Sequence, residues 1–101
     1  MPSPLAVLAL FAHPDDAEFL AAGTLAHLAN SGAVIHIATM TAGDCGSTIL
    51  PPAKITRIRQ KEAQRAASLM KASYTCLKEL DLLVCYDART IKKVLELVRR
   101  V

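Results

Sequence analysis

The residues of this chain whose types and spacing could support chemistry lie in one short turn near the N-terminus. His13, Asp15 and Asp16 stand within four residues, directly after an apolar run from Leu5 to Ala12. Imidazole and carboxylate groups are typical ligands of a catalytic zinc ion. One of the two adjacent carboxylates could also act as a general base toward a bound water. The turn is therefore a candidate for metal binding, for base catalysis, or for both.

The apolar run is the element that must position this turn. A continuous run of this length predicts a strand buried on both faces, as in the centre of a parallel sheet. Pro14 favours an extended His13 and ends the strand at about that residue. In open α/β sheets, ligands bind at the carboxyl ends of the strands. We therefore expect His13, Asp15 and Asp16 at that edge of a sheet.

Two other interpretations of the turn remain open from the residues alone. Asp15 as N-cap and Glu18 three residues later form an Asp-x-x-Glu capping box for the next helix. Capping leaves His13 and Asp16 without a role, but it explains the turn as well as chemistry does. A hard cation such as Mg²⁺ is a further alternative for paired carboxylates, although Mg²⁺ sites seldom use an imidazole such as that of His13.

The segment Ala12–Glu18, Ala-His-Pro-Asp-Asp-Ala-Glu, resembles the LmbE/PIG-L family of N-acetylglucosaminyl deacetylases. The resemblance implies a zinc hydrolase with a Rossmann-like fold that removes N-acetyl groups from glucosamine-type sugars. It also implies that His13 and Asp16 bind Zn²⁺ and that Asp15 is the general base.

A second segment supports the same resemblance. The stretch 40–52 has the composition of an irregular loop, with two glycines that let backbone N–H groups approach a ligand. Its first part resembles the Thr-x-Gly-Glu/Asp-x-Gly segment that follows the second strand of the family. The resemblance implies that this loop supports the site or contacts substrate through Thr41, Gly43, Asp44, Gly46 and Ser47.

The stretch 53–71 has the clearest helical periodicity in the chain, with an apolar face that includes Ile58 and Leu69. Arg59 and Glu62 fall within or beside that face, so we expect them to pair with each other or with the loop at 40–52. They could form a buried structural ion pair. The family shows an Arg-x-x-Glu at this helix, which favours a bracing role for both residues.

The whole pattern predicts an α/β fold with the order β-α-β-α-β-α. His27 and His36 fall inside elements and are expected to be structural, and Asp87 is a good N-cap. We expect a Rossmann-like three-layer α/β/α arrangement with a parallel sheet, and residues 1–101 as a single partial deacetylase domain without the family's C-terminal part. The expected strands are 5–13, 33–39 and 74–80, with an extended segment at 82–86, and the expected helices are 19–31, 53–71 and 87–101.

The composition argues against several other classes of protein. A net charge of +3 with 4% aromatic residues gives no basic or aromatic platform for nucleic acid. No apolar stretch is long enough to span a membrane, and no signal peptide is evident. Three cysteines, Cys45, Cys76 and Cys85, show no C-x-x-C spacing, which favours a reducing cytoplasm. The expected partner is a small amino-sugar substrate.

Ligand number limits the expected activity. A catalytic zinc has three protein ligands, and this sequence offers two at the turn, His13 and Asp16. The resemblance implies that the family's third ligand comes from a later histidine segment. We expect weak zinc binding and little turnover from these 101 residues. The alternative is a non-catalytic module that binds ligands or forms a homo-oligomer through an unpaired sheet edge.

Overall fold

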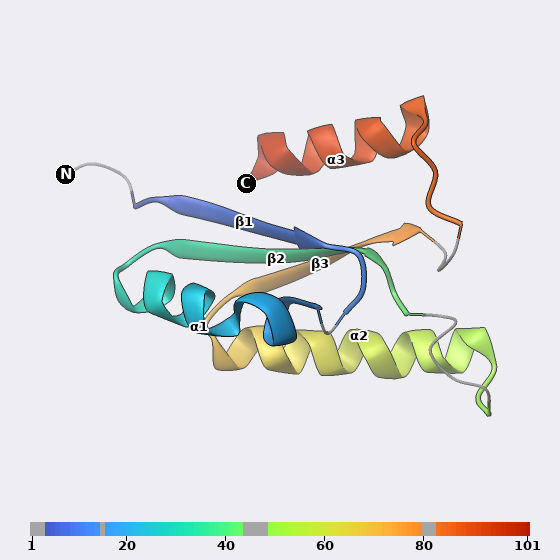
Figure 1. Ribbon diagram of the computed structural model, residues 1–101, viewed down its shortest axis with the longest axis horizontal. Helices are drawn as coiled ribbons and strands as arrows, with labels where there is room; N and C mark the ends of the chain where they lie inside the picture. Colours follow the sequence, from blue (N-terminus) through green and yellow to red (C-terminus); the bar gives the residue numbers. More distant parts are fainter. Residues whose placement is uncertain (1–3, 15, 44–48, 80–82) are drawn as a thin grey trace.

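The computed structural model describes residues 4–14, 16–43, 49–79 and 83–101, and of residues 17–20 only the backbone. Figure 1 shows one sheet with α1 and α2 on one face and α3 on the other. The predicted three-layer α/β/α arrangement with a parallel sheet is confirmed. The elements in chain order are β1 (Ala6–Phe11), α1 (Asp16–Asn30), β2 (Val34–Thr41), α2 (Pro52–Leu69), β3 (Ser73–Glu79) and α3 (Ala88–Arg100).

The central strand of this sheet is β2, with the order β1-β2-β3. Residues Ile35, Ile37 and Ala38 of β2 are buried, whereas β1 is only half-buried from Val7 onward. The expectation of a central strand at the first apolar run is therefore wrong for the described sheet. An apolar run indicates that a segment is a strand of a buried sheet. It does not determine whether that strand lies in the centre of the sheet or at its edge.

The hydrophobic core lies between the sheet and the helices α1 and α2. Leu25 of α1, Ile35 and Ile37 of β2 and Ala67 of α2 form a buried cluster, and alternate β1 side chains pack against it. In α2 the buried positions are Ile55, Ala63 and Ala67, which follow an i, i+4 spacing of small and branched residues. This narrow stripe lets the helix approach the sheet closely.

Several element boundaries and faces differ from the sequence predictions. Helix α1 begins at Asp16 and not at Phe19, and α2 ends at Leu69 and not at Lys71. Leu69 is 84% exposed and Ile58 is also exposed, so neither belongs to the packed face of α2. Residues 83–86 form no regular strand and are exposed. No helix among the described residues is long and apolar enough to cross a membrane.

Helix α3 is attached to the sheet by a buried carboxylate. Glu79, 6% exposed at the end of β3, lies 3.0 Å from Arg89 Nη2 and 3.2 Å from Lys93 Nζ. Hydrogen bonding from Arg89 is the main reason that the pKa of Glu79 lies below its ordinary value. The predicted N-cap is confirmed, because the Thr90 backbone N–H donates to Asp87 Oδ1 at 2.8 Å. Polar contacts therefore hold the first two turns of α3.

We predict that Glu79→Gln lowers the melting temperature at neutral pH. The folded-state pKa of Glu79 is depressed, so its ion pairs stabilise the fold above the ordinary carboxyl value of 4.5 and lose this effect as the pH falls through the lowered pKa. Thermal melts at a series of pH values should show a difference from the parent chain that shrinks in acid. Glu96→Gln, on an exposed position of α3, is the control. Identical melting temperatures of Glu79→Gln and the parent at pH 7 would contradict the prediction.

Candidate functional site

The turn after β1 brings His13 and Asp16 together at the carboxyl edge of the sheet. The Asp16 N–H donates to the His13 carbonyl at 3.2 Å, and the His13 N–H donates to Asp16 Oδ2 at 2.9 Å. His13 Nδ1 lies 3.6 Å from the same carboxylate oxygen. The backbone therefore closes into one turn that presents an imidazole and a carboxylate side by side, as the sequence predicts.

His13 and Asp16 are suitable ligands for a zinc ion, but two ligands are fewer than a catalytic zinc site requires. A carboxylate has about four acceptor positions, so the bond from the His13 N–H leaves Asp16 able to bind a cation. Within the described ranges, no three His, Cys, Asp or Glu side chains gather into a possible metal site. His36 is held by hydroxyl groups, with Nε2 3.0 Å from Thr75 Oγ1 and Nδ1 bonded to Ser73 Oγ. Burial lowers the pKa of His36, with a smaller effect from Arg100.

Several of the predicted site residues are not covered by the structure. Asp15, the predicted general base and alternative N-cap, lies outside the described residues. So do three positions of the second loop, Asp44, Gly46 and Ser47. Their roles stay predictions. Thr41 and Gly43 from the same loop segment are described, and both lie next to the turn.

Thr41 fixes the start of the turn. Both its backbone N–H and its hydroxyl donate to the Ala12 carbonyl, each at 3.0 Å. Ala12 directly precedes His13, so β2 determines where β1 ends and the turn begins. The sequence motif singles out Thr41 but not Thr39, which is buried two residues earlier on the same face of β2. The alternation of two threonines in an apolar strand is the signal that could have identified Thr39.

Gly43 lets the second loop pack closely against the turn and α2. Its φ is +74°, and a Cβ placed there would lie 3.3 Å from Arg59 Cγ and 3.4 Å from Pro14 Cδ. Pro14 is buried. The close packing at Gly43 thus brings together the turn, the loop and the aliphatic part of Arg59. A side chain at this position would separate them.

Arg59 and Glu62 pair as predicted, but only one of them is inward. Arg59 Nη1 lies 3.5 Å from Glu62 Oε2, and the side chains are 29% and 60% exposed respectively. The expectation that both lie on or beside the apolar face is therefore wrong for Glu62, since the buried stripe of α2 passes through positions 55, 63 and 67. Arg59 is next to Pro14 and Gly43, which is consistent with bracing of the turn.

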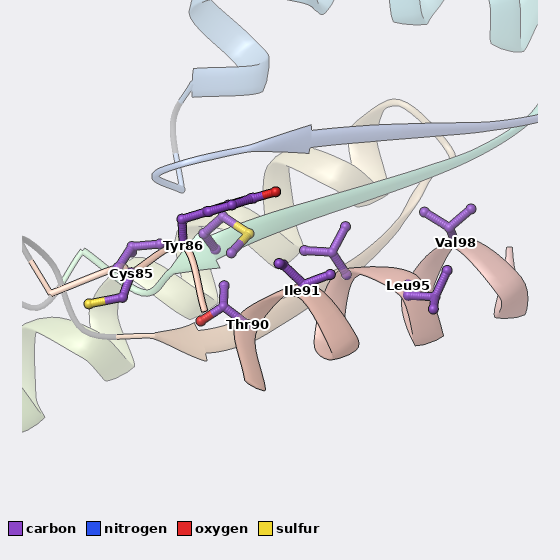
Figure 2. A pocket seen from close by; sticks show the side chains of 9 residues that line it. Cys85, Tyr86, Thr90, Ile91, Leu95 and Val98 are labelled. Carbon is purple, nitrogen blue, oxygen red and sulfur yellow. The ribbon is translucent and has the colours of Figure 1, made fainter. Parts of the chain in front are cut away.

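An apolar groove lies on the α3 side of the sheet. Figure 2 shows Ile91, Leu95 and Val98 projecting from α3 into a groove that Tyr86 borders at one end. Its volume is about 650 Å³, and Met40 of β2 also lines it. The apolar side chains on this face of α3 thus line an open groove. His13 and Asp16 are not among the lining residues.

We predict that Gly43→Ala destabilises the fold by about 1–2 kcal/mol, because a non-glycine residue at positive φ is strained and its Cβ meets Arg59 and Pro14. Gly23→Ala is the matched control. Gly23 lies inside α1, and apart from the nearby backbone of the helix no atom of the described residues lies within 4 Å of an added Cβ, so alanine there should stabilise the fold by about 0.5–1 kcal/mol. Urea unfolding measures both variants. Equal effects of the same sign would refute this account of Gly43.

Comparisons with known proteins place this chain in a family. The family model described as GlcNAc-PI de-N-acetylase, PIG-L, matches residues 8–101. The 1D-myo-inositol 2-acetamido-2-deoxy-alpha-D-glucopyranoside deacetylase of Segniliparus rotundus is 43% identical over 62 residues, which are 61% of this chain and 18% of that protein.

Two solved structures show the same fold. The N,N'-diacetylchitobiose deacetylase of Pyrococcus horikoshii is 28% identical with a TM-score of 0.89, over 94% of this chain and 37% of that one. The 4-carboxy-2-hydroxymuconate hydratase GalB of Pseudomonas putida is 26% identical with a TM-score of 0.88, over 96% and 43%. The chain thus spans less than half of these relatives. By its match over residues 8–101, this chain belongs to the PIG-L (LmbE-like) deacetylase family.

Proposed function

We propose that this chain carries part of the active site of a zinc-dependent hydrolase that removes the N-acetyl group from an N-acetylglucosamine-type sugar conjugate. The observation that carries the proposal is the His13–Asp16 pair, with Nδ1 and Oδ2 3.6 Å apart at the carboxyl edge of the sheet. The family match and the 43% identity to a sugar deacetylase over 62 residues support it.

In this proposal each residue of the turn has one role. His13 and Asp16 would hold Zn²⁺, which when bound would polarise the amide carbonyl and make a bound water more acidic. The Asp15 carboxylate takes a proton from the attacking water as the new carbon–oxygen bond forms. It returns that proton to the nitrogen as the carbon–nitrogen bond breaks, so the products are acetate and the free amine of the sugar.

The remaining parts of the proposal follow from ligand number and composition. Two protein ligands are fewer than the three of a catalytic zinc, so we expect these 101 residues to bind Zn²⁺ weakly and to turn over little substrate. Thr41, Gly43, Asp44, Gly46 and Ser47 would support the site or contact substrate. The absence of paired cysteine spacing favours the cytoplasm as its location.

The hydratase similarity supports a second candidate function. GalB matches this chain about as well as the chitobiose deacetylase does, with TM-scores of 0.88 and 0.89. Hydration of a carbon–carbon double bond and hydrolysis of an amide both begin with an activated water. The fold therefore does not separate the two reactions. The sugar deacetylase relative, at 43% identity over 62 residues, favours hydrolysis.

We predict that His13→Ala weakens Zn²⁺ binding at least about 10-fold, because it removes one of two protein ligands. Asp15→Asn should leave zinc affinity nearly unchanged and abolish whatever amine release the parent chain shows, since the amide cannot take the proton. Zinc titration calorimetry and an amine-release assay on an N-acetylglucosamine conjugate measure the two properties.

His27→Ala is the control, because His27 is exposed in α1 and should not affect either property. Unchanged zinc affinity in His13→Ala would refute the metal assignment. Preferential binding of Mg²⁺ would favour the hard-cation alternative. Water addition to an unsaturated acid without amine release would favour the hydratase function.

A further inference from the structure

We infer that a chain of three hydroxyl groups inside the sheet positions the His13–Asp16 turn. The chain runs from Tyr74 on β3 through Thr39 and Thr41 on β2 to the carbonyl of Ala12 at the end of β1. Tyr74 and Thr39 are therefore positioning residues, which act through Thr41 and touch no substrate. The inference rests on the proposed function, because it assigns these residues to the support of that site.

The last link of the chain sets the location of His13. The Ala12 carbonyl accepts from both the N–H and the hydroxyl of Thr41, each at 3.0 Å. This carbonyl belongs to the peptide bond that joins Ala12 to His13. A shift of Thr41 would therefore move the imidazole and, through the bond from the His13 N–H to Asp16 Oδ2, the carboxylate as well.

Each hydroxyl group has only one hydrogen to donate, and this determines which group donates in the other hydrogen bonds. The Thr39 hydroxyl donates its one hydrogen to the Thr41 carbonyl at 2.7 Å. The Tyr74 hydroxyl lies 2.7 Å from Thr39 Oγ1, so in this bond Tyr74 must donate and Thr39 accept. The Tyr74 hydroxyl thus orients the Thr39 hydroxyl, which in turn fixes the backbone of Thr41.

The local backbone explains why this support matters. The register between β2 and β3 is irregular at this point, since Thr39 pairs with Cys76 but Thr41 pairs with Glu79. Lys78, in the irregular part of β3, has a φ of +63°. Where the ladder is interrupted, the hydroxyl of Thr39 holds the Thr41 carbonyl. Thr39 and Thr41 are both fully buried, so water cannot replace a lost partner easily.

The same two strands carry other hydroxyl groups on the opposite face of the sheet, because Ser73 and Thr75 flank Tyr74 in β3. Thr75 Oγ1 lies 3.0 Å from His36 Nε2, and Ser73 Oγ bonds the other ring nitrogen. These bonds to His36 link the same two strands as Thr39 and Tyr74 do, but they do not lead to the turn. A purely structural role for hydroxyl groups would therefore give similar effects when either group is removed.

The test compares Tyr74→Phe and Thr39→Val with the control Thr75→Val. With metal-free protein, NMR measures the exchange rate of the Thr41 amide and the chemical shifts of the His13 ring. Zinc titration measures affinity. We expect both variants to speed Thr41 exchange and shift the His13 resonances, and to weaken zinc binding about 10-fold. Thr75→Val should change stability without these local effects, and Thr39→Ser should restore the parent values.

The outcomes separate this inference from the proposed function. If Tyr74→Phe and Thr39→Val perturb Thr41 and His13 no more than Thr75→Val does, the inference is wrong. If the parent chain binds no zinc but the NMR effects appear, the zinc assignment fails and the positioning role stands. Should Thr39→Val not fold, Tyr74→Phe decides, because it removes a single oxygen atom from a partly buried side chain.

Discussion

The pairing of β2 with both of its neighbours is the constraint on which the rest of this structure depends. In parallel pairs the strands end at one common edge, so the carboxyl ends of β1, β2 and β3 meet there. Thr41, the last residue of β2, binds the Ala12 carbonyl and so decides where β1 stops. The chemistry-bearing turn then starts from a buried and fixed point, although the side chains of His13 and Asp16 reach solvent. Rigid support beneath exposed donors is what a binding site requires.

The helices on the two faces of the sheet are held by different interactions. This difference distinguishes the surroundings of the candidate site from those of the apolar groove. On the α1 and α2 face, aliphatic side chains around Ile37 form a dry core, which Gly43 and Pro14 extend to the turn. On the α3 face, Glu79 and its cationic partners hold the first turns of the helix, and Leu97 is buried nearer its C-terminal end. The apolar stripe with Leu95 lies on a different face of the helix and lines an open groove (Figure 2). Stable packing thus concentrates on the side that supports His13.

Sequence patterns predicted the elements and the turn well because those depend on local features. Apolar runs, Pro14 and the Asp87 N-cap act over a few residues, and each strand and helix was found within about one turn of its place. Strand order was not predictable in the same way, because a buried run such as 5–12 fits a central or an edge position equally. The prediction of which residues face the core was also wrong where small side chains determine the packing. Glu62 and Leu69 of α2, for example, are exposed. The hydroxyl chain through Thr39 was missed, since Thr39 and Tyr74 are 35 residues apart in sequence.

A deacetylase and a hydratase share this fold, so the fold alone does not determine which reaction is catalysed. The choice of reaction then depends on a few groups at the edge of the sheet. Both reactions need an activated water, so in either case the proposed role of the turn at His13 is to hold and activate that water. What an amide adds is a leaving nitrogen, which must receive a proton before it departs. A base that can return its proton, as proposed for Asp15, serves hydrolysis better than a fixed cation alone would. In the proposed function, the Asp15 carboxylate beside the His13–Asp16 pair is therefore the group that would distinguish amide hydrolysis from hydration.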